Sequence, residues 1–403
     1  MKTNYRLSSN KLATIFRVFS WDILFFYLFS AVFLSQVRGF SDSQIFYTGL
    51  VVAATPVLLQ FLINKIAKAM GALKSVRFGM LCLFVFTIGI VFFSSPVLIF
   101  ISYFFYGLGS AFLVPNTSAL LVKNLKAEGR EEDFAKIEGR AAAIYYFTGG
   151  LASIGLGYLF EINPLLVMAF SAIAMAVGFL MSFMICEEGP SFAVVSTKMQ
   201  PESKKKIKPN PNFIFLLCLV LAFYGLIMQE HSLRQVLFQN VLFTPSMIGW
   251  INFAVSVSTG LSGLLFDFFK KRAKLALTIL PIGYLFLLLA MGLVCWLINS
   301  LAAAQVVIML GCCILPFFNL PFKIGAKDYV RQIVSEENQV SAYSMLYVVR
   351  NLSRIFYSLL LALLAGRVGS LQSLMLLPLF YLLLLAISLP IYLVQKKRKF
   401  SSN

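Results

Sequence analysis

Acidic residues and histidine are scarce in this sequence, and several kinds of catalytic site are missing from it. Its 403 residues include 16 Asp and Glu and one histidine, His231. The six cysteines have no C-x-x-C spacing, and no G-x-x-x-x-G-K-[S/T] loop for a nucleotide occurs. A histidine metal cluster is excluded, and no nucleophile–base set is recognisable. We therefore predict no enzymatic activity, no cofactor and no metal site.

Long apolar runs dominate the chain instead. Hydrophobic residues make up 60 % of it, charged residues only 12 %, and the mean hydropathy is +0.86. Because a membrane-spanning helix takes about 20 apolar residues, the sequence predicts an all-α membrane protein with twelve transmembrane helices. The expected spans are 15–37, 44–64, 76–94, 97–122, 139–161, 164–186, 212–237, 246–268, 275–297, 301–322, 339–366 and 370–394.

The net charge of +18 comes from basic clusters on one side of the expected membrane. Each cluster follows an even number of spans, and positive residues are retained on the cytoplasmic side of membrane proteins. The clusters fall in residues 1–17, 65–77, 123–140, 198–208, 270–274, 323–331 and 396–399. We predict a multi-pass protein of the cell (plasma or inner) membrane with both termini in the cytoplasm. This placement accounts for the positive charge without a nucleic-acid partner.

The sequence also predicts two halves. Residues 187–211 are polar and rich in proline and lysine, which is typical of a flexible linker. They would join an N-terminal six-helix half, residues 1–186, to a C-terminal six-helix half, residues 212–403. A shift of 203 residues aligns FSDSQI at 40–45 with FTPSMI at 243–248. Two related halves of this kind are a known plan of membrane transporters.

One loop motif links the repeat to a known family. Residues 263–272, GLLFDFFKKR, carry a glycine, an aspartate four positions later and a basic run. They follow the pattern G-x-x-x-D-R-x-G-R-R, and Tyr103-x-x-x-Gly107-Leu108-Gly109 follows R-x-x-x-G-x-G with tyrosine in place of arginine. The sequence thus resembles a major facilitator superfamily transporter over nearly its whole length.

The resemblance implies two pseudo-symmetric bundles of six helices, with a cytoplasmic gate at this loop. The gating residues would be Gly263, Asp267, Lys271 and Arg272. The first copy of the loop departs from the pattern, because Asn64 or Lys68 stands where the aspartate belongs. The fifth-span G-P-x-x-G-G signature of drug–proton antiporters is absent.

Two arginines interrupt the apolar run from residue 338 to residue 366. Arg350 and Arg354 lie about 3 Å either side of its midpoint, where a lone arginine costs roughly 3 kcal/mol and must face protein or a water-filled cavity. Three tyrosines share their helical face: Tyr343, Tyr347 and Tyr357. This stripe is either part of a solute-binding cavity, since a guanidinium group suits carboxylate or phosphate, or a structural clamp between helices. Tyr146 in the fifth span is a further candidate for the cavity, with packing as its alternative.

Carboxylates within the spans are candidates for proton coupling. Asp22 lies in the first span, and its alternative role is a plain ion pair. Glu230 lies four residues before Arg234 on one face of the seventh span, so these two side chains are expected to pair. We interpret His231 as a hydrogen-bonded helix residue. Glu138 and Arg140 at the start of the fifth span are expected to form a gate or tether pair.

Together these features predict a secondary active transporter that works by alternating access. The charged residues within the spans carry one more positive than negative charge, which favours a small organic solute with an anionic group. We expect proton coupling, a monomer, and no partners other than solute, protons and lipid. An efflux antiporter for amphipathic drugs is the alternative within transport, and a non-transporting membrane receptor is the alternative of another class.

Overall fold

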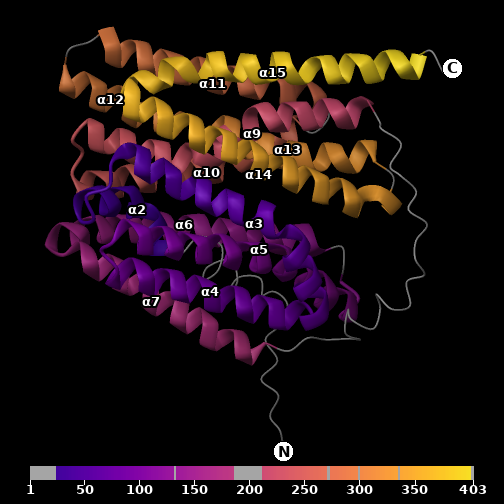
Figure 1. Ribbon diagram of the computed structural model, residues 1–403, viewed down its shortest axis with the longest axis horizontal. Coiled ribbons are helices and arrows are strands. Elements are labelled where there is room, and N and C mark those ends of the chain that lie inside the picture. Colours follow the sequence, from indigo (N-terminus) through magenta and orange to yellow (C-terminus); the bar gives the residue numbers. More distant parts are fainter. Residues whose placement is uncertain are drawn as a thin grey trace, which may run out of the picture. The chain divides into compact units, whose positions relative to one another are not determined.

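The computed structural model describes residues 24–130, 133–185, 211–269, 273–297, 300–334 and 336–400, and every regular element in these residues is a helix. The helices are shown in Figure 1. They are α2 (Leu24–Gln36), α3 (Asp42–Met70), α4 (Ala72–Phe92), α5 (Pro96–Ala127), α6 (Phe134–Ile162), α7 (Pro164–Met181), the 3-10 turn η2 (Ser182–Met184), α9 (Pro211–Asn240), α10 (Pro245–Phe269), α11 (Ala273–Leu297), α12 (Leu301–Ile314), α13 (Pro316–Ile333), α14 (Glu336–Arg367) and α15 (Ser370–Phe400).

The helices confirm the all-α membrane fold. Each expected span overlaps a helix, and within the described residues nine segments are long and apolar enough to cross a membrane. The tenth expected span is present but divided, because α12 ends at Ile314 and α13 begins at Pro316. Proline has no N–H to donate to the carbonyl four residues earlier, so the helical hydrogen bonding is interrupted there.

The chain forms two compact units that do not follow the sequence halves. The first unit comprises Met1–Phe33, Ala54–Ser203 and Pro245–Phe253, and the second comprises Leu34–Ala53, Lys204–Thr244 and Ala254–Asn403. The start of α3 therefore belongs with helices from the second half of the sequence, and the start of α10 with helices from the first half. We call Leu34–Ala53 and Pro245–Phe253 the exchanged segments. The predicted division into residues 1–186, 187–211 and 212–403 stays a prediction.

The first unit is packed through small residues and aromatic rings. A Cβ on Gly109 of α5 would lie 2.9 Å from the carbonyl oxygen of Gly79 of α4, so the two helices touch through their backbones. Phe26 of α2 packs edge-on against Phe86 of α4, with ring centroids 5.3 Å apart. At one end of the unit, Arg77 donates to the carbonyl of Ser182 and so holds the end of the sixth expected span.

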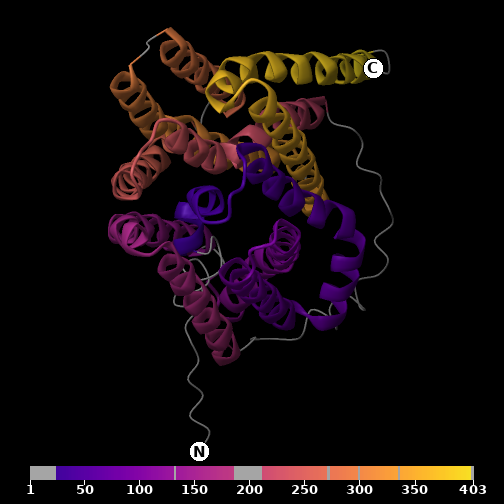
Figure 2. The ribbon, with the colours of Figure 1, turned by 60° about the vertical axis from the view of Figure 1, so that its left-hand side comes forward.

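The second unit is built around α9, most of which is buried. Phe223 packs edge-on against rings from three other helices, namely Tyr284 of α11, Phe322 of α13 and Tyr381 of α15. Figure 2 shows the last two helices, α14 and α15, in orange to yellow. They are joined through Gly369, whose φ of 86° suits glycine. Because α9 touches so many neighbours, its polar side chains are held in fixed positions.

Each exchanged segment is fixed by a serine at the second position of its helix. In the second unit, the Ser43 hydroxyl of α3 donates to the carbonyl of Ala362 of α14 at 2.7 Å. In the first unit, the Ser246 N–H of α10 donates to Glu161 Oε1 of α6 at 2.9 Å. Ser43 and Ser246 are 203 positions apart, which is the shift of the sequence repeat. The repeat therefore recurs in the contacts that each segment makes.

A glycine accompanies each serine. A Cβ on Gly366 of α14 would lie 2.9 Å from the Ser43 hydroxyl oxygen, and a Cβ on Gly157 of α6 would lie 2.6 Å from the Pro245 carbonyl oxygen. In the second unit, Asp42 adds hydrogen bonds from Ser370 at 2.6 Å and from Asn240 at 3.1 Å. The close approach needs a residue without a side chain at 157, where the obstacles are backbone atoms, whereas at 366 the only obstacle is the Ser43 hydroxyl.

Candidate functional site

The arginine stripe of α14 lies against α9 in the second unit. Arg350 Cζ is 4.6 Å from the ring centroid of Tyr347 on its own helix and 5.5 Å from that of Tyr224 on α9. These distances are in the range of cation–π attraction. Two aromatic rings thus flank a guanidinium group within the candidate span Met345–Arg367.

Within the described residues, neither guanidinium group is neutralised. The side chains of Arg350 and Arg354 have no hydrogen-bond or ion-pair partner there, and the buried Nε–H of each is unsatisfied. Both side chains are nevertheless partly exposed. An arginine that is exposed within a membrane span cannot face lipid at low cost, so its open side is expected to face a polar cavity.

The three tyrosines of the stripe differ in their placement. Tyr347 lies beside Arg350, whereas Tyr357 is wholly buried and its hydroxyl donates to the carbonyl of Ala222 at 2.6 Å. This placement favours a packing role for Tyr357 over contact with a solute. The side chain of Tyr343 falls outside the description. Tyr146 belongs to the first unit, where its ring packs against Tyr145 with centroids 5.2 Å apart.

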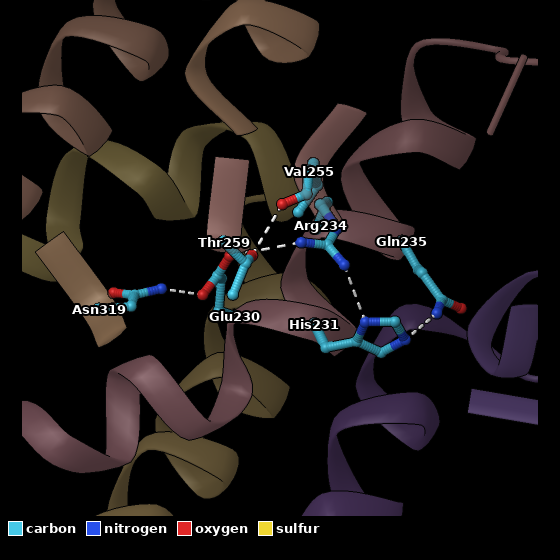
Figure 3. Close-up of polar contacts among 7 residues, drawn as sticks. All are labelled: Glu230, His231, Arg234, Gln235, Val255, Thr259 and Asn319. Atoms are coloured by element: carbon cyan, nitrogen blue, oxygen red, sulfur yellow. Dashed lines mark hydrogen bonds and ion pairs between the residues drawn. The ribbon is translucent and has the colours of Figure 1, made fainter. Parts of the chain in front are cut away.

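A second charged cluster lies on the same helix α9 (Figure 3). Glu230 Oε1 is 3.4 Å from Arg234 Nη1, which confirms the expected pair within the helix. Asn319 of α13 donates its amide N–H to the other Glu230 oxygen. Both charged side chains are largely buried, with 12 % of Glu230 and 9 % of Arg234 exposed. The arginine and the amide donor favour the ionised carboxylate, whereas its burial opposes the charge.

His231 completes this cluster and its protonation state follows from geometry. Arg234 Nη2 is 3.0 Å from His231 Nδ1. Arginine can only donate, so Nδ1 must accept and carries no proton. A neutral ring then carries its proton on Nε2, and the neighbouring Gln235 amide matches it only when the amide oxygen faces the ring. The interpretation of His231 as a hydrogen-bonded helix residue is confirmed.

The cluster holds more positive than negative charge. Lys323 of α13 interacts electrostatically with Glu230, in addition to Arg234. Two buried polar atoms beside it, Tyr284 OH and Asn319 Oδ1, have no hydrogen-bond partner among the residues that the structure describes. Unsatisfied buried groups are rare in folded proteins. The cluster therefore combines buried charges with polar atoms that the described protein does not satisfy.

Several predicted site residues lie outside the description. Asp22, Lys271 and Arg272 are not described, so neither the first proton-coupling candidate nor the basic run of the gate can be located. The backbones of four other gate residues lie on α6 and α10, but their side chains are outside the description. These are Glu138, Arg140, Gly263 and Asp267.

The structure adds three residues that the sequence did not single out. Tyr224 flanks Arg350, while Asn319 and Lys323 meet Glu230. Tyr224 lies on α9 and contacts a side chain of α14. Asn319 and Lys323 lie on α13 and interact with a side chain of α9. A polar residue at the end of an apolar run, such as Asn319 or Lys323, carried a weak signal. Tyr224 carried none, because tyrosine is common throughout these helices.

Comparison with solved structures gives the fold. Over 96 % of this chain and 96 % of that chain, a POT family transporter in complex with 5-aminolevulinic acid is similar with a TM-score of 0.71 and 15 % identity. A bacterial homologue of the iron transporter ferroportin in an inward-facing state matches with a TM-score of 0.66 and 17 % identity, over 96 % and 98 % of the two chains. The nucleoside transporter NupG matches with a TM-score of 0.63 and 13 % identity, over 97 % and 99 %.

These neighbours are transporters with the major facilitator fold, and this chain has that fold over nearly its whole length. No protein-family model and no curated protein matches the sequence. Because the titles of these neighbours name different kinds of transporter, the shared fold leaves the solute to be inferred from the site itself.

Proposed function

We propose that the protein is a proton-coupled secondary transporter that moves a small organic solute bearing an anionic group. The observation that carries this proposal is the pair of guanidinium groups, Arg350 and Arg354, without a partner among the described residues. Two cations within a membrane span that have no partner among the described residues are suited to bind an anion. A guanidinium group binds a carboxylate or phosphate through two parallel hydrogen bonds. Tyr347 and Tyr224 hold the first of them in place.

Proton coupling is assigned to Glu230 and Asp22. Glu230 is bonded to Arg234 and Asn319, so protonation of its carboxylate would weaken the pair and release Arg234. A proton would thereby change the charge of α9, the helix that also carries Tyr224. Asp22 is the second candidate, because it is a carboxylate within the first expected span, where burial and neighbouring charges shift the protonation of an acid.

Alternating access is proposed to operate between residues 1–186 and 212–403, joined by the linker 187–211. The cytoplasmic gate would use Gly263, Asp267, Lys271 and Arg272, with Glu138 and Arg140 tethering the fifth span. Both termini would lie in the cytoplasm of a cell (plasma or inner) membrane, as the basic clusters support. A monomer is sufficient for this cycle, because each chain holds both halves.

The test is uptake by purified protein in proteoliposomes. Anionic, zwitterionic and cationic solutes are compared with and without a pH gradient, in the wild type and in Arg350→Lys. The lysine keeps the charge and loses the planar fork, so the affinity for an anionic solute should fall by roughly 1–3 kcal/mol. Normal affinity together with a lowered melting temperature would mean that the arginine is structural, and the anion site would be abandoned.

Efflux of amphipathic compounds is the second candidate. Its support is the aromatic surroundings of Arg350, where Tyr224 itself lies 6.4 Å from the Phe322 ring. Aromatic rings suit bulky apolar solutes without fixed geometry. In the same uptake screen, transport of lipophilic cations that is unaffected by Arg350→Lys would favour this reading.

A further inference from the structure

The helices α9 and α14 cross at a point where their backbones touch. A Cβ on Gly225 of α9 would collide with the carbonyl oxygen of Ser353 and lie 2.6 Å from the backbone nitrogen of Arg354. Both obstacles are backbone atoms, so no rotamer change can make room. The Gly225 N–H also donates to the Ser353 hydroxyl oxygen at 2.7 Å. The crossing thus requires glycine at position 225, and the hydroxyl of Ser353 stabilises it through a hydrogen bond.

Further contacts hold the same two helices on either side of the crossing. The Tyr357 hydroxyl of α14 donates to the carbonyl of Ala222, and Gln229 of α9 donates to the Ser358 hydroxyl. Ser353, Tyr357 and Ser358 are wholly buried. Close approach through small residues and interhelical hydrogen bonds is how membrane helices are joined, since lipid gives no hydrophobic force between them. The two helices therefore behave as one rigid pair at this level.

The residues of the arginine site are the direct neighbours of this crossing. Tyr224 directly precedes Gly225 on α9. On α14, Arg354 directly follows Ser353, and Arg350 lies about one helical turn before Arg354. The 5.5 Å separation of Arg350 Cζ from the Tyr224 ring spans the two helices. Any change in the distance between α9 and α14 changes that separation directly.

We infer that Gly225 and Ser353 are positioning residues, whose contact sets where Arg350 and Arg354 stand relative to Tyr224. The inference rests on the proposed function, in which the two guanidinium groups bind the anionic group of the solute. An arginine side chain has many rotamers, and holding it beside a ring lowers the entropy lost when an anion binds. The crossing supplies that pre-organisation without touching the solute.

The experiment measures the arginine site by chemical modification. Phenylglyoxal, which modifies guanidinium groups, is applied to purified wild-type protein and to Gly225→Ala, and labelling of Arg350 is quantified by mass spectrometry. Arg130 is the internal reference, because its side chain is 43 % exposed and lies far along the chain in the loop before α6. Separation of Tyr224 from Arg350 should raise the labelling of Arg350 relative to Arg130 by about threefold, as loss of a cation–π contact would.

Anion binding is read in the same assay by protection. Benzoate is used as a planar carboxylate, and the concentration that halves labelling of Arg350 is determined. We expect this concentration to rise about tenfold in Gly225→Ala, because small displacements of positioned groups are costly. The control is Gly260→Ala in α10 of the same unit, where a Cβ meets nothing within 4 Å. If Gly225→Ala does not yield folded protein, the same measurements are made on Ser353→Ala. This variant removes only the hydroxyl.

The possible results distinguish a failure of the positioning role of Gly225 and Ser353 from a failure of the proposed anion site. Labelling and protection that are the same in Gly225→Ala, Ser353→Ala and Gly260→Ala would overturn the positioning role and leave the anion site standing. A lowered melting temperature with unchanged labelling and protection would also overturn it, since that is a structural effect alone. Absence of benzoate protection in the wild type would count against the proposed function, while the labelling ratio would still decide whether the crossing positions Arg350.

Discussion

Ser43 donates its hydroxyl to the carbonyl of Ala362, a residue 319 positions later in the chain. Its repeat counterpart Ser246 reaches Glu161, 85 positions earlier. Each serine stands at the second position of a helix whose first part belongs to the unit built mainly from the other sequence half. Helix contacts that lie so far apart in the sequence are the natural places to ask whether the halves separate during transport.

A disulfide between the first pair of helix ends should stop transport. The ideal Cβ of Gly366 lies 2.9 Å from the Ser43 hydroxyl oxygen, which places the two Cβ atoms within reach of a disulfide. Ser43→Cys with Gly366→Cys should cross-link on mild oxidation, arrest uptake, and regain uptake after reduction. Each single variant is the control. Full uptake by the cross-linked protein would mean that this contact never opens.

A methyl group at Gly157 should disturb the corresponding contact of the first unit. The added Cβ would lie 2.6 Å from the Pro245 carbonyl oxygen, whereas a Cβ on Gly155, two residues earlier in α6, meets nothing within 4 Å. Gly157→Ala should lose about 1–3 kcal/mol of stability through overpacking. Gly155→Ala should be neutral or slightly stabilising, because alanine favours the helix. Thermal melting in detergent compares them, and equal melting temperatures would contradict the close contact.

Replacement of Glu230 should lower the stability of the protein more than replacement of Arg234. Glu230→Gln leaves Arg234 and Lys323 without the carboxylate that interacts with both, whereas Arg234→Gln leaves Glu230 with Lys323 still near. Breaking a buried pair costs roughly 3–5 kcal/mol, and the first change should cost more than the second. The double variant should cost less than the sum of the two. Additive losses in melting experiments would show that the residues do not interact.

The same cluster tests coupling. If Glu230 carries the transported proton, Glu230→Gln should abolish uptake driven by a pH gradient and leave solute counterflow largely intact. Asp22→Asn is compared in the same assays as the other candidate. Equal loss of both activities in a variant would mark its carboxylate as structural, since counterflow needs no net proton movement.

Replacement of His231 by asparagine or by glutamine should change the melting temperature by different amounts. Its Nδ1 accepts from Arg234 at 3.0 Å. The side-chain oxygen of asparagine can stand near the Nδ1 position, whereas glutamine places its amide near Nε2. His231→Asn should therefore keep the melting temperature closer to the wild type than His231→Gln does. The reverse order would show that the Nε2 side of the ring, facing Gln235, is the important one.

Orientation in the membrane is tested by labelling. A cysteine placed in the linker 187–211 should react with an impermeant reagent only from the cytoplasmic side, and one in place of Ser41 only from outside, in a background without the native cysteines. The basic clusters motivate this expectation. Reaction of both positions from the same side would contradict the twelve-span topology.

The sequence predicted what depends on hydropathy and on local spacing. The span positions follow from apolar length, and the pair of Glu230 and Arg234 follows from their separation of four residues. The helix break at Pro316 had a visible cause in proline but no visible position within the run. Contacts that depend on how two helices cross had no local signal. Gly225 is one of 25 glycines, and only the backbone of α14 against it shows why no side chain fits.

The exchanged segments also set a time order for biogenesis. Leu34–Ala53 is made early, yet Ala362 and Ser370, which bond Ser43 and Asp42, come more than 300 residues later. At a synthesis rate of roughly 5–20 residues per second, the start of α3 waits some tens of seconds in the membrane for its partners. During that interval its serine, aspartate and glycines face lipid or the insertion machinery. The final two helices thus complete the contacts of a helix that was inserted long before. A chain that ends near residue 350 would keep Asn240 beside Asp42 but would lack Ala362 and Ser370.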